Sequence, residues 1–199
     1  RLTDEISQIR KDYAKKLSDQ IVAALVDLNF LDVRFEIAFK KLAEPNENGG
    51  DEVCFMISTN PGLPLRPLAS VASGGELSRI MLAIKAVMAD KDAVETLIFD
   101  EIDTGISGRT AQKVSEKMAV IAKNHQLLCI THLAQIAAHA DAHLLIEKQV
   151  RGDRTYTEIR PLDTAGRCAE LARIMNGADH PTEAQLASAA ELLKNAQEA

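Results

Sequence analysis

The stretch TLIFDEIDTGIS, Thr96 to Ser107, decides how we interpret the fold. A short apolar strand ends there in two adjacent carboxylates, Asp100 and Glu101. Ligand sites in parallel α/β sheets lie at the carboxyl ends of strands, and side chains alternate along a strand, so the two carboxylates should point in different directions. One of them can hold Mg²⁺, mostly through water, and the other can face a water molecule and act as general base. Two solvated acids at a strand end are the alternative.

The next apolar strand, QLLCITH at residues 126–132, ends in a histidine. Neighbouring strand ends of a parallel sheet converge on one crevice, where His132 could donate a hydrogen bond to a phosphate or a water molecule. A lone histidine that caps the strand is the alternative. The other four histidines have no metal-like partners, and we interpret them as surface or helix-end residues: His125, His139, His143 and His180.

The stretch SVASGGELSRI, residues 70–80, predicts the start of a helix that can hold an anion. Ser73 can cap the helix, and Glu76 three residues later completes a capping box. Gly74 and Gly75 leave backbone N–H groups bare, so a phosphate could approach closely. The chain contains no G-x-x-x-x-G-K-[ST] loop. The predicted apolar face of this helix comprises Leu77, Ile80, Met81, Ile84 and Met88.

Before this helix, the chain predicts an amphipathic helix and a β-hairpin. Apolar residues recur at steps of three and four over residues 1–29, which is typical of a helix at the end of a coiled coil. Arg1 offers no N-cap, so we expect a piece of a longer helix and a longer protein. Strict alternation over residues 33–39 and an apolar run at 52–58 predict two strands, joined by the turn cluster at 44–50. Residues 60–73 are rich in proline and should be irregular.

After residue 95, strands and helices alternate. We expect strands at 95–101, 126–132 and 142–148, an edge strand at 154–162, and helices at 108–123, 133–140, 165–175 and 182–196. Apolar strands that alternate with helices indicate an α/β fold with a parallel sheet flanked by helices. The helix at 108–123 should bury Ala111, Val114, Met118 and Ile121.

Composition limits the class of protein. Of 199 residues, 46% are hydrophobic and 26% are charged, and a net charge of −6 argues against a general nucleic-acid coat. Aromatic residues make up only 4%, so stacking platforms for bases are not indicated. No apolar run is long enough to span a bilayer. Three separated cysteines without a C-x-x-C pair indicate reduced thiols of a cytoplasmic protein, with Cys129 in the core.

Three segments in this order resemble the ABC and SMC superfamily of ATPases. SGGELSR resembles its signature motif, TLIFDEIDTGIS resembles the Walker B motif running into the D-loop, and ITHLAQIAAHAD resembles the switch-histidine segment. A closer resemblance, over residues 68–148 and the tail RPLDTAGRCAELARIMNG, is to the RecN family of bacterial SMC-like proteins of DNA double-strand-break repair.

The resemblance implies the C-terminal lobe of an ABC/SMC-type ATPase head. Residues 1–31 would end a coiled-coil arm, and residues 32–199 would form the head portion that lacks the Walker A half. ATP and Mg²⁺ are the implied cofactors. Asp100 would organise Mg²⁺, Glu101 would activate water and His132 would sense the γ-phosphate. The signature residues would bind an ATP held mainly by a partner subunit: Ser73, Gly74, Gly75 and Glu76.

The D-loop departs from one common pattern, because Ser107 stands where many relatives have an aspartate. The resemblance therefore places the subunit contact, loosely, on Asp103, Gly105 and Ser107.

The resemblance implies three partners: the chain's own Walker A half, a second head that sandwiches ATP, and DNA. It implies no membrane partner and a location in the bacterial cytoplasm at the nucleoid.

The resemblance implies that ATP binding and hydrolysis drive head dimerisation and release on DNA during double-strand-break repair and recombination. Alone, this chain should hydrolyse no ATP, because it has no Walker A loop. The alternatives are the nucleotide-binding subunit of an ABC transporter, another SMC-type chromosome-maintenance ATPase, and a non-catalytic scaffold module.

Overall fold

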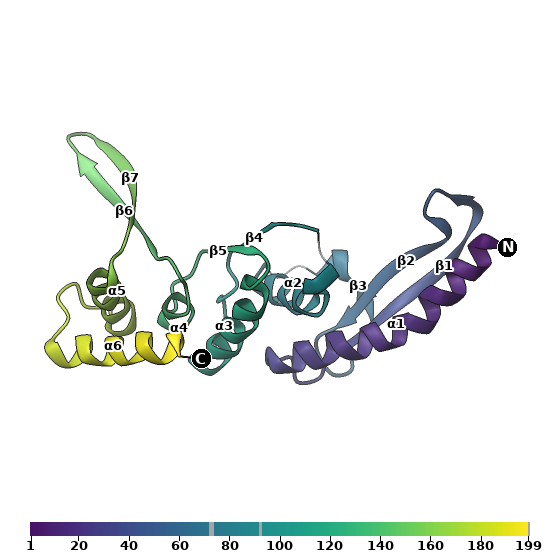
Figure 1. The fold of residues 1–199 in the computed structure, drawn as a ribbon, viewed down its shortest axis with the longest axis horizontal. Helices are drawn as coiled ribbons and strands as arrows, with labels where there is room; N and C mark the ends of the chain where they lie inside the picture. Colours follow the sequence, from purple (N-terminus) through teal and green to yellow (C-terminus); the bar gives the residue numbers. More distant parts are fainter. Residues whose placement is uncertain (72–73, 92, 199) are drawn as a thin grey trace. The chain divides into compact units, whose positions relative to one another are not determined.

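The computed structural model describes residues 1–71, 74–91 and 93–198 (Figure 1). Its tertiary contacts divide the chain into two units. The first contains Arg1–Gly105 and Glu116–Cys129, and the second contains Ile106–Ser115 and the chain from Ile130 onward.

In the first unit, a long helix lies along a β-hairpin. Helix α1 (Leu2–Asp27) packs on strands β1 (Arg34–Asn46) and β2 (Gly49–Ser58), which pair antiparallel. Ile21 and Leu25, in the C-terminal half of α1, are fully buried, whereas Leu2 and Ile9 near its start are exposed. Both the predicted N-terminal helix and the predicted hairpin are confirmed.

The proline-rich segment contains more regular structure than predicted. Strand β3 (Arg66–Pro67) pairs antiparallel with β2, and the 3₁₀ turn η1 (Leu68–Ser70) follows it. Helix α2 (Gly74–Met88) then packs on α1 and runs into the 3₁₀ turn η2 (Ala89–Lys91). The predicted apolar face of α2 was partly wrong, because Met88 is exposed and Leu82 is fully buried.

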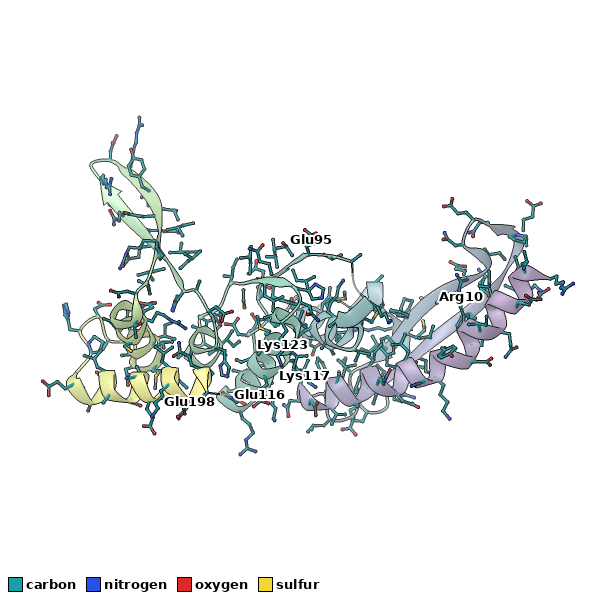
Figure 2. The ribbon with its side chains drawn as sticks, in the orientation of Figure 1. Arg10, Glu95, Glu116, Lys117, Lys123 and Glu198 are labelled. Carbon is teal, nitrogen blue, oxygen red and sulfur yellow. The ribbon has the colours of Figure 1, made fainter. Side chains whose placement is uncertain are left out.

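Strands β4 (Thr96–Phe99) and β5 (Gln126–Cys129) form the predicted parallel pair, and helix α3 (Gly108–Ala122) connects them in the chain. All four residues predicted on the apolar face of α3 are buried: Ala111, Val114, Met118 and Ile121. Lys117 of α3, labelled in Figure 2, forms an ion pair with Asp27 at the end of α1, with Nζ 2.7 Å from Oδ2.

The second unit is built on three helices. Helices α4 (Ala134–Ala138), α5 (Thr164–Asn176) and α6 (Glu183–Gln197) share a core in which alanines allow close approach around Leu171 and Leu193. Gly177 ends α5 in a left-handed conformation with φ 65°, as its Asn-Gly sequence predicts. A capping box between Thr182 and Gln185 starts α6.

The strand at 142–148 was predicted to belong to the parallel sheet, and that detail was wrong. Strands β6 (Leu144–Arg151) and β7 (Arg154–Pro161) pair antiparallel with each other, and among the described residues neither pairs with β5. The physical reason is the two-residue turn between them, at Gly152 and Asp153, where Gly152 has φ 68°. Such a short connection forces an antiparallel hairpin.

Candidate nucleotide site

The first turn of α2 lies directly against the loop that follows β4. A Cβ atom on Gly75 would lie 2.9 Å from the carbonyl oxygen of Glu101 and 3.0 Å from Cβ of Thr104. The first contact is shorter than real Cβ atoms show and is with backbone, which cannot move aside alone, and the second is tighter than most Cβ contacts. The close approach of helix and loop therefore requires glycine at this position.

Glu101 is held in a strained conformation beside Gly74. Its φ of 57° is left-handed, which L-residues other than glycine, asparagine and aspartate rarely adopt. Its side chain extends to Gly74, where Oε2 lies 2.6 Å from the place that a Cβ atom would take. The Thr104 N–H donates to the Glu101 carbonyl at 3.1 Å and closes the loop into a turn. Strained residues of this kind are concentrated at functional sites.

Two neighbouring side chains of α2 donate to the same loop. Ser78 Oγ donates to the Asp100 carbonyl at 2.9 Å, and Arg79 Nη1 donates to the carbonyls of Ile102 and Thr104 at 3.3 and 3.0 Å. Arg79 is only 8% exposed, and burial lowers the pKa of its guanidinium, an effect that the Glu76 carboxylate opposes.

Asp100 and Asp103 differ sharply in exposure. Asp100 is exposed at the end of β4, whereas Asp103 is 3% exposed.

Burial raises the pKa of the half-buried Cys129 thiol to about 12, with smaller contributions from the charges of Asp103 and Asp100. A thiol of this kind stays protonated near neutral pH and is unreactive, as expected for a packing role.

The donor set at Asp100 fits Mg²⁺ in combination with a nucleotide. No cluster of three or more metal-ligating side chains occurs within residues 1–71, 74–91 and 93–198. Mg²⁺ at nucleotide sites commonly uses one or two carboxylates and takes its other ligands from waters and phosphates. The exposed Asp100 carboxylate beside Glu101 supplies that minimum.

The structure brings Gly74, Gly75, Asp100 and Glu101 together within the first unit. His132 is exposed and belongs to the second unit, three residues after the end of β5. Ser73 lies outside the described residues. The remaining predicted site residues are placed as follows: Glu76 is half-buried on α2, Gly105 has φ 72°, and Ser107 is exposed, with its carbonyl accepting from the Ala111 N–H at 2.9 Å.

Sequence analysis missed the residues that support the loop, Ser78 and Arg79, although both lie in the SGGELSR stretch. His125, interpreted as a surface or helix-end residue, lies just after the end of α3, where its N–H donates to the Ile121 carbonyl at 3.1 Å, and it is buried. The ring nitrogens of His125 lie 2.8 Å from the Val94 carbonyl and 3.1 Å from the Ala89 carbonyl, so it fastens the segment before β4. No pattern in the sequence signals such backbone partners.

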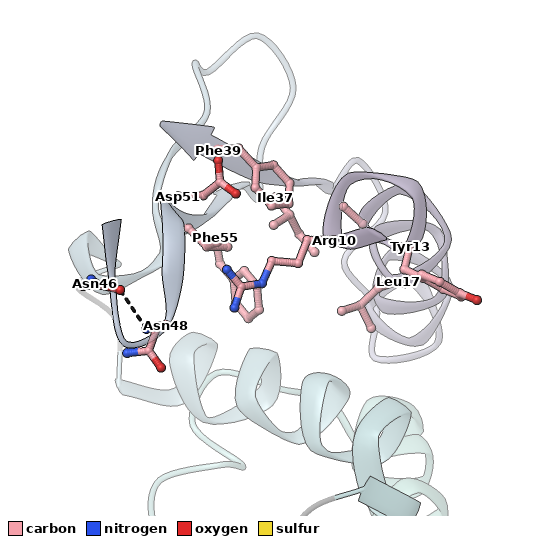
Figure 3. Close-up of a pocket in the computed structure, with 11 residues that line it drawn as sticks. Arg10, Tyr13, Leu17, Ile37, Phe39, Asn46, Asn48, Asp51 and Phe55 are labelled. Atoms are coloured by element: carbon pink, nitrogen blue, oxygen red, sulfur yellow. Dashed lines mark hydrogen bonds between the residues drawn. The ribbon is translucent and has the colours of Figure 1, made fainter. Parts of the chain in front are cut away.

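A separate groove of about 580 Å³ lies between α1 and the β1–β2 hairpin (Figure 3). Arg10 extends from α1 into it, toward a wall that includes Phe39 and Phe55. None of the predicted site residues lines this groove.

No helix in the described part of the chain is long and apolar enough to cross a membrane.

Comparison with known proteins finds close relatives over nearly the whole chain, although no family model matches. The DNA repair protein RecN of Bacillus subtilis is 45% identical over 206 residues, which cover 96% of this chain and 36% of the relative. RecN of Vibrio cholerae is 42% identical over 96% of this chain and 34% of its own length. The chain thus spans about a third of the length of the curated relatives it matches.

Solved structures show the fold. The Smc head domain with a coiled coil and joint from Pyrococcus yayanosii matches with a TM-score of 0.56 and 19% identity, over 87% of this chain and 32% of that one. A chain from work on the ATP-driven dimerization and DNA-stimulated activation of SMC ATPases matches with a TM-score of 0.50 and 17% identity, over 85% of this chain and 97% of that one. The chain is therefore similar to about a third of the length of the RecN proteins and has the fold of an SMC-type head.

Proposed function

We propose that this chain is the signature and Walker B part of a RecN-like ATPase that acts in DNA double-strand-break repair and recombination. The observation that carries the proposal is the contact between the start of α2 and the loop after β4, where Gly75 packs on Glu101 and Thr104. A helix start with two glycines can bind an anion, and a pair of exposed carboxylates at a strand end lies where ligands bind in parallel sheets, so both can contribute to an ATP site between heads.

Each residue has a distinct role in this proposal. Glu101 accepts a proton from the attacking water, and Asp100 binds the metal. The backbone N–H groups of Gly74 and Gly75, with Ser73 and Glu76, bind the γ-phosphate of a nucleotide carried by a partner subunit, because a helix N-terminus favours an anion. Mg²⁺, when bound, would neutralise charge on the phosphates. His132 donates a hydrogen bond to the γ-phosphate.

The proposal extends to partners and location. A Walker A loop has to come from elsewhere in the longer protein, since this chain contains none. Two heads would pair around ATP on DNA, with Asp103, Gly105 and Ser107 near the contact, and hydrolysis would release the heads from each other. Residues 1–31 would form the end of a coiled-coil arm, and the protein would act in the cytoplasm at the nucleoid. Alone, the chain would not hydrolyse ATP.

The decisive experiment is the substitution Glu101→Gln in the full-length protein. Removal of the general base should lower ATP turnover by roughly 10²- to 10⁴-fold while ATP binding persists. Turnover and binding of a fluorescent ATP analogue would be measured in the same preparation, with and without DNA.

Glu95→Gln is the matched control, because Glu95 is an exposed glutamate just before the same strand (Figure 2). Its turnover should equal that of the unmodified protein. Unchanged turnover in Glu101→Gln would remove Glu101 from its role. Complete absence of ATP hydrolysis in the unmodified full-length protein would contradict the proposed function as a whole.

A further inference from the structure

Three carbonyl groups of the loop that carries Glu101 are held from one side by two adjacent side chains of α2. We propose that Arg79, assisted by Ser78, is a positioning residue that holds the general base Glu101 in its productive conformation. This inference rests on the proposed function, since it presupposes that Glu101 is the base.

The hydrogen bonds bracket Glu101 on both sides. Ser78 donates to the carbonyl of the residue before it, and Arg79 donates to the carbonyls one and three residues after it. A left-handed glutamate is unfavourable and persists only where its surroundings impose it. With the flanking carbonyls fixed, the backbone at Glu101 cannot rotate back to an ordinary conformation without breaking these bonds.

The Arg79 guanidinium packs over the ring of Phe30, which lies just beyond the end of α1. Its central carbon lies 5.6 Å from the centre of the Phe30 ring, within the range of a cation–π contact. Phe30 is 7% exposed, and its N–H donates to the Leu25 carbonyl at 3.1 Å, so the ring is anchored to the last turn of α1. The Arg79 side chain of α2 therefore contacts both the loop after β4 and the segment that ends α1.

Arginine suits this position better than lysine. A guanidinium is planar, so its face can stack on a ring while its N–H groups, which lie in the same plane, donate to carbonyls at its edge. A lysine ammonium is a point charge that cannot satisfy both requirements, and it would carry a larger hydration penalty in a buried place. The conservative replacement should therefore fail to restore function.

The test measures kcat and KM for ATP in the full-length protein carrying Arg79→Ala, Arg79→Lys or Ser78→Ala. Misplacement of a catalytic group by about 1 Å can lower the rate about 100-fold, so we expect a loss of kcat approaching that size for both Arg79 variants, with KM nearly unchanged. Ser78→Ala should show a smaller loss of the same kind. Arg154→Ala, at an exposed arginine that begins β7, is the control.

The amount of ATP analogue bound at saturation separates positioning from loss of fold. Partial unfolding lowers the apparent kcat and the bound analogue together, whereas loss of a positioning residue lowers kcat and leaves the bound analogue unchanged. If Arg79→Ala does not fold, Arg79→Lys and Ser78→Ala decide the matter. A kcat in Arg79→Lys and Ser78→Ala equal to the control would overturn the inference, even where Glu101→Gln abolishes turnover. Absence of turnover in the unmodified protein would overturn the proposed function and this inference with it.

Discussion

At Gly75, a single methyl group should be enough to separate the helix from the loop. The substitution Gly75→Ala would place a Cβ atom 2.9 Å from one backbone oxygen and 3.1 Å from another, at Glu101 and Thr104. Because backbone must shift to admit it, we expect a fall in the free energy of unfolding of about 1–3 kcal/mol. Urea unfolding of the isolated chain measures it.

Gly108→Ala is the matched control for Gly75→Ala. Gly108 is also the start of a helix, but a Cβ atom there would meet only the Gln135 side chain, at an ordinary 3.4 Å. Alanine should stabilise the chain by about 0.5–1 kcal/mol, because the unfolded state loses conformational freedom. Equal effects of the two substitutions would contradict the tight contact at Gly75.

Individual residues can be singled out in the sequence where a proposed function depends on residue type in a fixed order. Gly74, Gly75 and Glu101 stand out because an anion site and a general base would need those residue types, and the structure places them side by side. Arg79 was not singled out, because its partners are carbonyl groups, which every residue possesses. The left-handed conformation of Glu101 was equally hidden, since glutamate has no preference for it.

At the level of elements, periodicity predicted the helices well and the strand partners less well. The face of α3 is buried as its spacing indicates, because a helix with one apolar side has one way to pack. For β6 and β7, the alternation of apolar and polar residues predicts a strand but does not indicate which strand it pairs with. The two-residue turn at Gly152 and Asp153 is the feature of the sequence that indicates the antiparallel pair.

The junction between β6 and α5 should make the stability of the second unit depend on pH. His143 lies there, its carbonyl accepts from the Leu162 N–H at 2.9 Å, and its ring atom Nδ1 is buried without a hydrogen-bond partner. Burial lowers the pKa of His143 from 6.5, the charge of Arg167 lowers it further, and Glu170 opposes both. The folded state therefore takes up a proton less readily than the unfolded state.

It follows that stability should fall as the pH decreases through 6.5, because the unfolded chain is protonated first. The loss continues until the pH passes below the pKa of folded His143. His143→Gln should flatten this dependence in urea unfolding at about pH 7.5 and about pH 5.5. His180→Gln, at an exposed position, should leave it unchanged. A slope that survives in His143→Gln would assign the effect to another group.

For the whole molecule, the two-stranded parallel sheet is the feature that needs more protein around it. Ile98 and Leu128 are directly paired across β4 and β5, yet they are 68% and 45% exposed. Parallel sheets in α/β proteins have both faces covered. The relatives are about three times as long as this chain, so we expect the rest of the longer protein to cover this pair.

The substitution Ile98→Lys distinguishes a covered face from an open one. In the isolated chain the lysine would remain in water, and the thermal midpoint should change little. In the full-length protein it would bury an unpaired charge, so the head should lose several kcal/mol of stability and ATP turnover with it. Val120→Lys, at an exposed valine of α3, is the control. If Ile98→Lys were as harmless in the full-length protein as in the isolated chain, the sheet face would be open, and the expected cover over β4 and β5 would be ruled out.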